Sequence, residues 1–402
     1  MPNKDTLSFR APQGVPRDRT HRDQRPHLLL IESIPTIAGG QAAMVQLASG
    51  WHDALKISAL LPGPGPLADA LASQGVTCFF AEQGDYTLLR KTRRDVTAYA
   101  RRLPRLVSTT ARLIREQGID MLYANSARTF AWAALAATFA RRPVLWHHHA
   151  LLADATTLHL VTNVARLPAV RRVICSSSGA QAQFASVAPK TIVIPYGINT
   201  DRFAPNPAAR TKIRQSLGLG PDELVVGMVG DLIPLKGQDT LIKALQSSPD
   251  SPALPPITTL FIGGPRPGEA ESEAYAAHLQ QIAGPNVHFL GRRSDIPDLL
   301  NAIDLLVVAS SRETGPLVLL ESLACTTPAL STPVGISPDL LPADAIFPVG
   351  DAQALRAALQ RWLADPARRA STGTTGRSQV IQELSLPSYQ SRVLAEIHAF
   401  LP

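Results

Sequence analysis

Short apolar runs alternate with longer segments of helical periodicity along most of the chain. The runs are rich in Val, Ile and Leu and end at turn-forming residues, as expected of strands buried on both faces. Segments between them, such as 41–49 and 238–245, carry apolar residues at the spacing of one helix face. This alternation predicts an α/β fold with parallel sheets covered by helices on both sides. The predicted strands are 27–32, 57–61, 76–81, 121–124, 144–147, 173–176, 191–194, 224–230, 259–262, 287–290 and 305–309.

A turn-rich segment, 195–207, divides the alternation into two series and is typical of a domain boundary. A prior of about 150 residues per domain also favours two or three domains for this length. We predict an N-terminal domain over 26–200 and a C-terminal domain over 201–380. The final stretch, 381–402, is predicted to be largely helical, and the polar, Pro-rich residues 1–25 are expected to form a disordered basic arm.

The clearest ligand-binding pattern is a strand, a polar loop and a helix over 305–324. The loop carries Glu313, Pro316 suits a first helical turn, and Glu321 lies on the helix predicted over 317–324. Unpaired amides at the helix start favour an anion, and the two carboxylates could accept hydrogen bonds from hydroxyl groups. The pattern therefore predicts a ligand loop at the carboxyl end of a strand in an open α/β sheet.

Two further turns have ligand-binding character. Gly39 and Gly40 follow the first strand and could let the backbone approach a ligand closely, although a plain tight turn explains them equally well. Lys236 precedes Gly237 at the mouth of the helix 238–245, where a lysine suits a diphosphate. An exposed lysine in a turn is the simpler structural explanation.

Three adjacent histidines, His147, His148 and His149, end the predicted strand 144–147. They cannot all face one point, because alternate side chains of a strand point to opposite faces. No HExxH motif or carboxylate partner is in view, so no metal site is predicted. Either one histidine is buried and two are at the surface, or one lines the ligand crevice at the carboxyl end of the strand.

Positive charge is concentrated in the first half of the chain. Residues 1–200 hold 23 Lys and Arg against 12 Asp and Glu, a net +11, whereas residues 201–402 hold 16 against 20, a net −4. The densest basic run, 90–115, interleaves arginines with apolar residues at helical spacing. It predicts either a solvated helix face or a surface for an anionic membrane or a lipid-phosphate acceptor. Nucleic acid is not expected, because aromatic residues are not interleaved with the basic ones.

Cysteine usage and hydropathy restrict the compartment. Cys78, Cys175 and Cys325 lie far apart without a CxxC motif, which fits a reducing environment and excludes a cysteine-rich zinc site. No uninterrupted apolar segment reaches about 20 residues, so no membrane-spanning helix is predicted. The polar N-terminus also lacks the apolar core of a signal peptide. We therefore expect a cytoplasmic protein.

Five segments of the C-terminal half carry recognisable motifs in a fixed order. They are VGMVGDLIPLKGQDTLIKAL, LFIGGP, VHFLGRRSDIPDLLNAIDLLVVASS, the Glu-x7-Glu block ETGPLVLLESLA, and TPVG. The hinge-like IPYGINTDRF of residues 194–203 precedes them. In this order the chain resembles the retaining glycosyltransferases of family 4, which have the GT-B fold.

The resemblance implies two Rossmann-like parallel-sheet domains that face a central cleft. The first would bind the acceptor and the second a UDP- or GDP-sugar, with transfer of a hexosyl unit and retention of anomeric configuration. The acceptor would be a glycan or a lipid-linked group, as in cell-surface polysaccharide or glycolipid synthesis. No cofactor or metal is expected, because a lysine and helix amides would stabilise the departing diphosphate. Such an enzyme could be peripheral on the inner face of a membrane.

The resemblance also assigns site residues. Glu313 matches the glutamate that faces the donor sugar, Glu321 the one that binds the ribose hydroxyls, and Lys236 the lysine of the diphosphate. His149, or alternatively His147, matches the crevice histidine of the first domain. The predicted catalytic residues are thus Glu313, His149 and Lys236. The predicted donor-binding residues are Gly39, Gly40, Lys236, Gly263, Arg293, Glu313, the amides of Leu317 and Val318, and Glu321.

Several positions depart from the family pattern, and one of them bears directly on the donor diphosphate. Asp231 stands where family members usually have arginine, and an aspartate beside a diphosphate is repulsive by about 1 kcal/mol or more. Either another arginine supplies the charge, or donor binding is altered. The alternative function is a non-catalytic sugar-nucleotide-binding or scaffold subunit with the same fold. The candidate arginines are Arg266, Arg292, Arg293 and Arg312.

Overall fold

The structure, a computed structural model, describes residues 24–84, 93–152, 154–246 and 253–401. The predicted N-terminal arm, 1–25, lies almost entirely outside the described residues, as does the start of the basic run 90–115. The chain divides into two compact units. Unit 1 holds the described residues up to Ile194 together with the C-terminal segment from Tyr389, and unit 2 is Pro195–Ser388.

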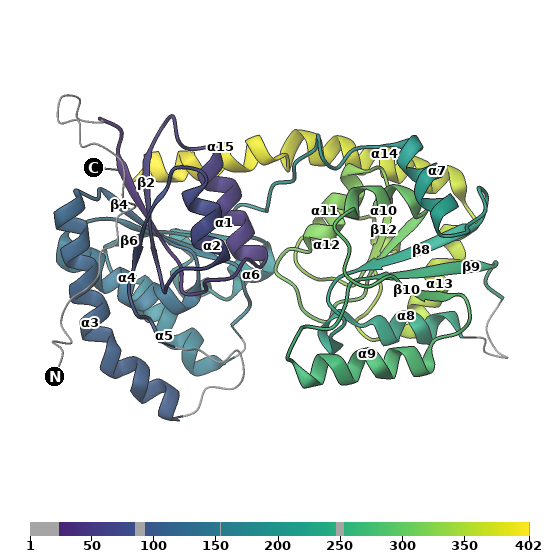
Figure 1. The fold of residues 1–402 in the computed structure, drawn as a ribbon, viewed down its shortest axis with the longest axis horizontal. Helices are drawn as coiled ribbons and strands as arrows, with labels where there is room; N and C mark the ends of the chain where they lie inside the picture. The colour runs from purple at the N-terminus through teal and green to yellow at the C-terminus, as the bar shows by residue number, and fades with distance from the viewer. Residues whose placement is uncertain (1–23, 85–92, 153, 247–252, 402) are drawn as a thin grey trace. The chain divides into compact units, whose positions relative to one another are not determined.

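Unit 1 is built on a parallel sheet of seven strands in the order β3-β2-β1-β4-β5-β6-β7 (Figure 1). The strands are β1 (His27–Ile31), β2 (Lys56–Leu61), β3 (Thr77–Phe80), β4 (Met121–Ala124), β5 (Val144–His148), β6 (Val170–Cys175) and β7 (Thr191–Val193). The helices are α1 (Gly39–Ser49), α2 (Pro66–Ala72), α3 (Arg93–Gln117), α4 (Ala127–Ala140), α5 (Ala155–Ala165), α6 (Ser178–Ala182) and the 3₁₀ helix η1 (Ala185–Lys190).

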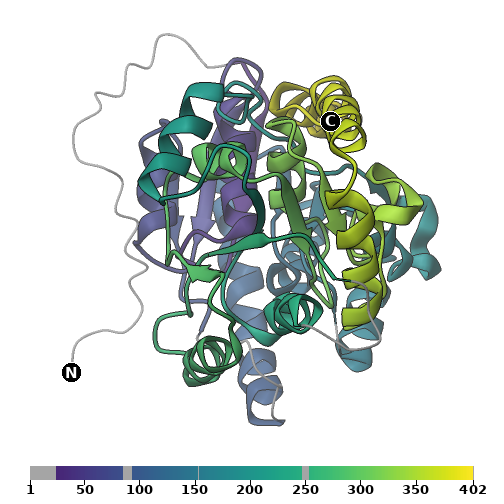
Figure 2. The same ribbon diagram turned by 90° about the vertical axis from the view of Figure 1, so that its right-hand side faces the viewer.

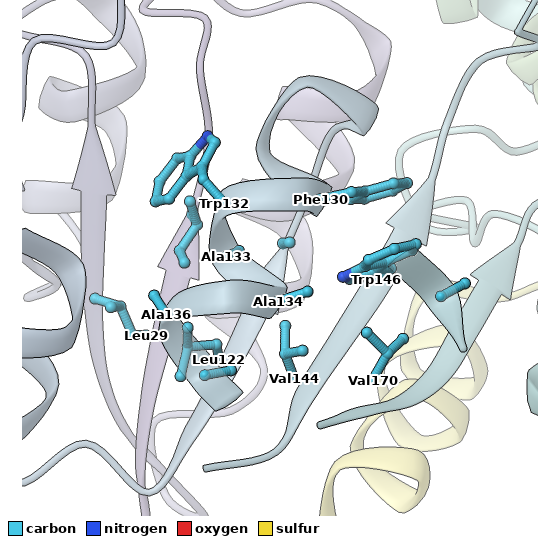
Figure 3. Packing of buried hydrophobic residues seen from close by; sticks show 14 of the residues in the cluster. Leu29, Leu122, Phe130, Trp132, Ala133, Ala134, Ala136, Val144, Trp146 and Val170 are labelled. Atoms are coloured by element: carbon cyan, nitrogen blue, oxygen red, sulfur yellow. The ribbon is translucent and has the colours of Figure 1, made fainter. Parts of the chain in front are cut away.

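The core of unit 1 forms where α4 crosses the sheet (Figure 3). Alanines on this helix let it approach the strands closely, and its aromatic side chains fill the remaining space. Phe130 stacks on Trp146 of β5 with ring centroids 4.4 Å apart and planes 4° from parallel. Such a pair adds about 1 kcal/mol beyond the area it buries. Across the described parts of the chain, every helix is too short or too polar to span a lipid bilayer.

The basic run forms an amphipathic helix, α3, as its periodicity predicts. The side chains of Arg101, Arg105 and Arg112 are exposed, whereas Leu106 and Leu113 are buried in the unit 1 core. The apolar face of α3 is therefore used by packing within unit 1, and what it presents to solvent is positive charge.

Unit 2 contains a second parallel sheet, with strand order β10-β9-β8-β11-β12. Its strands are β8 (Leu224–Val229), β9 (Ile257–Ile262), β10 (Val287–Phe289), β11 (Leu305–Val308) and β12 (Ala329–Ser331). Its helices are α7 (Pro207–Ser216), η2 (Pro234–Lys236), α8 (Gln238–Leu245), α9 (Ala270–Ile282), α10 (Ile296–Ala302), α11 (Leu317–Ala324), α12 (Ser337–Leu340), η3 (Ala343–Ala345), α13 (Ala352–Leu363) and α14 (Pro366–Glu383).

Helices cover both faces of this second sheet (Figures 1 and 2). Helices α8, α9 and α13 pack together on one face, and α7, α10, α11 and α14 pack on the other. The predicted fold class, α/β with two parallel-sheet domains, is confirmed. One predicted strand, 173–176, begins earlier than expected, at Val170, because the charged Arg171 and Arg172 interrupt its apolar pattern.

The last helix, α15 (Leu386–His398), begins in unit 2 and continues into unit 1. Within unit 1, the Gln390 carbonyl accepts a hydrogen bond from the Trp51 indole N–H at 3.1 Å. Arg172 of β6 forms an ion pair of 2.6 Å with Glu396. The C-terminal segment is thus an integral part of the first unit.

Candidate functional site

Four of the predicted donor-binding residues of unit 2 follow the carboxyl ends of neighbouring strands. Lys236 follows β8, Gly263 follows β9, Arg293 follows β10 and Glu313 follows β11. Since these four strands are adjacent in the order β10-β9-β8-β11, their loops meet at one edge of the sheet. This edge is where open α/β sheets bind their ligands.

Lys236 and Glu313 form an ion pair between the loops of β8 and β11. The Lys236 ammonium donates to Glu313 Oε1, which also accepts from the Ser310 hydroxyl at 3.1 Å. Both charged side chains are partly exposed, with 26% and 20% of their area accessible. A ligand can therefore reach the lysine and the carboxylate from solvent.

Gly237 explains how Lys236 reaches this position. It has φ +71°, and a Cβ atom there would lie 2.4 Å from the Ala309 carbonyl oxygen at the end of β11. Only glycine permits both the left-handed backbone and this close approach. The loop that carries Lys236 thus rests directly on the strand that leads to Glu313.

Helix α11 begins beside this ion pair. Its N-terminal residue is Leu317, and no side chain in the described structure caps the first turn, so the amides of Leu317 and Val318 keep the positive end of the helix dipole open. The loop after β12 packs against this helix start. Gly335 there has φ +55°, and a Cβ atom would lie 2.9 Å from Pro316 Cδ.

Glu321 lies on the second turn of α11 and is only partly exposed. Burial raises the pKa of its carboxyl group to about 7, and Arg202 opposes this shift. A carboxyl group with such a pKa is easily neutralised, and hydrogen bonds from ligand hydroxyls would favour its charged form.

The two remaining donor-binding candidates of unit 2 have structural partners. A Cβ atom on Gly263, at φ +147°, would lie 1.9 Å from the Gly230 carbonyl oxygen, so this glycine lets the ends of β8 and β9 approach closely. Arg293 forms a bidentate ion pair with Asp295 in its own loop, at 2.8 and 2.5 Å. Their roles toward a donor stay predictions.

Asp231 is paired with two of the four candidate arginines. Its carboxylate accepts from Arg266 Nε and from Arg292 Nη2, each at 2.9 Å. The negative charge of Asp231 is therefore offset within unit 2 by cations from the two neighbouring loops. From the sequence, these two arginines could be given only as candidates.

In unit 1, Gly40 and His149 lie together at the carboxyl ends of β1 and β5. A Cβ atom on Gly40 would lie 3.0 Å from His149 Cγ, so the glycine admits the imidazole against the start of α1. Gly39 is exposed, with open space around its Cα atom. The structure thus brings two of the three predicted unit 1 residues into contact.

Sequence reasoning missed the two residues that hold His149. His149 Nε2 lies 2.9 Å from Asn125 Oδ1, and the Asn125 amide donates to Glu32 Oε2 at 2.8 Å and to the Gly40 carbonyl at 3.1 Å. The Glu32 side chain is fully buried and also accepts from Gln41 at 3.0 Å. Because the Asn125 amide faces two acceptors, its Oδ1 must face the imidazole, which therefore donates from Nε2. Glu32 is the last residue of the predicted strand 27–32 and Asn125 directly follows the predicted strand 121–124, and these positions were the available signal.

The three histidines differ from the arrangement with one buried and two at the surface, whereas the alternative that one of them lines a ligand crevice stays a prediction. His147 and His148 are both fully buried and His149 partly so, because β5 is a central strand covered on both faces. His147 pairs with the Tyr123 hydroxyl at 2.5 Å and His148 with Gln183 at 3.3 Å. Burial, and then the charge of neighbouring histidines, lowers the pKa of His149 to about 3 and that of His147 well below 6.5. Burial lowers the pKa of His148 to about 4.

In the described residues, no cluster of three or more His, Cys, Asp or Glu side chains is arranged to hold a metal ion.

These shifts predict that acid destabilises unit 1. The unfolded histidines, with pKa near 6.5, bind more protons than the folded ones below that pH, so stability is complete above pH 6.5 and falls toward pH 4. At pH 5 we expect His148 and His149 each to remove about 2 kcal/mol from the free energy of unfolding. Urea unfolding followed by tryptophan fluorescence measures this, since three of the four tryptophans lie in unit 1.

A matched variant isolates one histidine. In His148→Gln the loss of stability between pH 7.5 and pH 5 should be about 2 kcal/mol smaller than in the parent protein. Equal losses in the two proteins would show that folding does not lower the pKa of His148.

Two protein-family models match the chain. The model described as Glycosyltransferase Family 4 matches residues 63–202, and the one described as Glycosyl transferases group 1 matches residues 209–379. Together they cover most of both units.

Two curated relatives resemble parts of the chain. A GDP-mannose-dependent monoacylated alpha-(1-6)-phosphatidylinositol monomannoside mannosyltransferase of Corynebacterium glutamicum is 33% identical over 48% of this chain and 52% of the relative. The lipopolysaccharide core biosynthesis mannosyltransferase LpsB of Rhizobium meliloti is 27% identical over 58% of this chain and 67% of the relative. The chain spans about half the length of the first of these relatives.

Two solved structures resemble nearly the whole chain. Anabaena HepE in complex with UDP has a TM-score of 0.77 at 23% identity and covers 93% of this chain and 100% of that chain. Sucrose-phosphate synthase of Thermosynechococcus elongatus has a TM-score of 0.73 at 23% identity, with the same coverage of both chains. These likenesses establish a shared fold, and activity has to be argued from the residues.

Proposed function

Because the chain belongs to the family 4 glycosyltransferases and has the GT-B fold, we propose that it transfers a hexosyl unit from a UDP- or GDP-sugar to a glycan or lipid-linked acceptor, with retention of anomeric configuration. The observation that carries the proposal is the Lys236–Glu313 ion pair beside the uncapped start of α11. It combines a cation and amides for phosphate with a carboxylate for sugar hydroxyls.

In this proposal the bond between the anomeric carbon and the diphosphate oxygen breaks, and the diphosphate keeps the electron pair. Lys236 and the amides of Leu317 and Val318 stabilise the charge that develops there, without a metal ion. Glu313 binds the donor sugar and Glu321 the ribose hydroxyls. The acceptor oxygen bonds to the anomeric carbon, and its proton passes to the departing diphosphate.

Unit 1 is proposed to bind the acceptor. From the family resemblance, His149, Gly39 and Gly40 are proposed to contact the donor sugar. The names of the two relatives support a lipid-linked acceptor, because one is described as acting on a phosphatidylinositol mannoside and the other in lipopolysaccharide core synthesis.

A donor panel tests the proposal. The protein is incubated with UDP-glucose, UDP-galactose or GDP-mannose, and release of UDP or GDP is followed with and without lipid and polysaccharide acceptors. We expect slow donor hydrolysis with one nucleotide and faster release when an acceptor is present. Calorimetric binding of UDP or GDP without any turnover would favour the scaffold subunit that Asp231 suggests. Binding of neither nucleotide would contradict both functions.

We further propose that α3 attracts unit 1 to an anionic membrane surface, at the inner face of a membrane. Its apolar side chains are buried in the unit, so the attraction would come from exposed arginines such as Arg101, Arg105 and Arg112. Each contributes about 1 kcal/mol near an anionic bilayer, and salt screens this attraction.

Co-sedimentation with phosphatidylglycerol vesicles should therefore be strong at 50 mM salt and weak at 500 mM. Changing the three arginines to alanine should remove most of the low-salt binding, since about 3 kcal/mol is lost. Equal binding to neutral phosphatidylcholine vesicles would contradict an electrostatic attachment.

A further inference from the structure

We infer that Arg266 and Arg292, held side by side by Asp231, supply the positive charge for the donor diphosphate, for which the family resemblance implies an arginine at position 231. The inference rests on the proposed function and deepens it. Asp231 is then a positioning residue, and the two arginines are the groups that meet the phosphates.

The first support is that one carboxylate joins three neighbouring loops. Asp231 directly follows β8 and Gly230, while Arg266 comes from the loop after β9 and Arg292 from the loop after β10. Each arginine donates to a different oxygen of Asp231 at 2.9 Å. Because the strand order is β10-β9-β8, both cations are brought to the same edge of the sheet.

The second support is that Lys236 lies next to this group. A Cβ atom built on Gly230 would be 3.4 Å from Lys236 Cε and 3.7 Å from Nζ. The lysine therefore lies over the residue that precedes Asp231. A phosphate that reaches Lys236 is close to the loop that holds the two arginines.

The third support is that the group is rigidly supported by backbone contacts. The buried Gln238 donates to the Asp231 carbonyl oxygen at 2.9 Å. Arg292 Nη2 also donates to the Pro265 carbonyl at 3.0 Å, and a Cβ atom on Gly264 would lie 3.3 Å from Arg292 Cγ. The arginines are thus oriented before any ligand arrives, which lowers the entropy lost on binding.

The net charge of Asp231, Arg266 and Arg292 agrees with this role. One aspartate and two arginines leave a single net positive charge, the same as one arginine at position 231. The side chains of Arg266 and Arg292 are 39% and 54% exposed, so part of each guanidinium faces solvent. Glu269 also approaches Arg266, at 3.5 Å, but it is 45% exposed, and such a pair contributes little. Guanidinium groups fixed in this way favour phosphate oxygens, which they can bind with two parallel hydrogen bonds.

Calorimetric titration of the full chain with UDP and with GDP tests the inference. We expect Arg266→Ala and Arg292→Ala each to weaken binding of the preferred diphosphate about tenfold, as removal of a charge-assisted hydrogen bond does. The matched control is Lys243→Ala, which removes one positive charge from an exposed ion pair on α8 and should change binding less than twofold. Thermal melting of each variant checks that unit 2 stays folded.

The variant Asp231→Asn distinguishes a positioning role of Asp231 from a purely electrostatic effect of its negative charge. The change raises the net charge of unit 2 by one, so electrostatics alone would tighten diphosphate binding. If Asp231 positions the arginines, binding weakens instead, by about fivefold, because one of the two carboxylate oxygens is replaced by an NH2 group, which cannot accept from the arginine that faces it. The triple variant Asp231→Arg with Arg266→Ala and Arg292→Ala keeps the net charge of the group and should recover part of the affinity lost by the two alanine changes.

Two outcomes would overturn the inference and they are distinct from failure of the proposed function. One is that the parent protein binds a diphosphate while both alanine variants bind it within twofold of the parent. The other is that Asp231→Asn binds more tightly than the parent. If the parent protein binds neither UDP nor GDP, the proposed function itself fails, and the inference fails with it.

Discussion

Replacing Glu313 with alanine should abolish measurable sugar transfer, a loss of about 100- to 1000-fold or more, while unit 2 stays folded. Its side chain is 20% exposed and contacts Lys236 and Ser310 in the loop after β11, so its removal costs little stability. The reaction loses the carboxylate that is proposed to bind the donor sugar, and Lys236 loses the partner that orients it. Product formation with the donor found in the panel measures the effect.

Glu273→Ala is the matched control for this change. It removes an exposed carboxylate from the same unit, in the first turn of α9, and should leave transfer unchanged within about twofold. Thermal melting of both variants separates a catalytic loss from unfolding. Full transfer activity in Glu313→Ala would remove Glu313 from the proposed site.

Replacing Asp304 with alanine should lower the free energy of unfolding of unit 2 by about 3 to 5 kcal/mol. Asp304 directly precedes β11, and its carboxylate accepts from the Val225 amide at 2.8 Å and from Arg210 at 2.6 Å. It also pairs at 3.5 Å with Arg214, which is only 3% exposed. Without Asp304 that guanidinium is buried with carbonyl oxygens alone, an uncompensated charge. Stability is measured by urea unfolding, with amide hydrogen exchange in β8 and β11 to assign the loss to unit 2.

An exposed ion pair gives the comparison. Asp295→Ala breaks the bidentate contact with Arg293, whose side chain is 35% exposed, and should cost less than about 1 kcal/mol. If the two aspartate variants lose similar stability, burial of Arg214 is not what makes the Asp304 pair important.

Much of the fold could be predicted because a strand that is buried on both faces has a short, continuous run of apolar residues in the sequence. The run 305–309 and the helix 317–324 needed only this pattern and a proline at the helix start. The prediction for β6 began late because the charged Arg171 and Arg172 interrupt its apolar run. The pairing register with β5 shifts at Arg171, and Arg172 forms an ion pair with Glu396, and apolar content cannot reveal either feature.

Pairings between loops could not be predicted, since they depend on the order of strands in each sheet. Lys236 and Glu313 are 77 residues apart, and they meet only because β8 and β11 are neighbours. The same holds for Asp231 and its arginines, which sequence could name only as candidates. The buried Glu32 and Asn125 were missed for a related reason. Each is one polar residue after an apolar run, which in isolation is typical of any strand end.

The path of the backbone through α15 has a consequence for biosynthesis. Unit 2 is one continuous stretch, Pro195–Ser388, inserted into unit 1, whose final segment is supplied only after unit 2 has been made. During translation, all seven strands of unit 1 are made before unit 2, whereas the helix that binds Trp51 and Arg172 is made after it. The first unit to be started is therefore the last to be completed, because its packing waits for α15 to leave the ribosome.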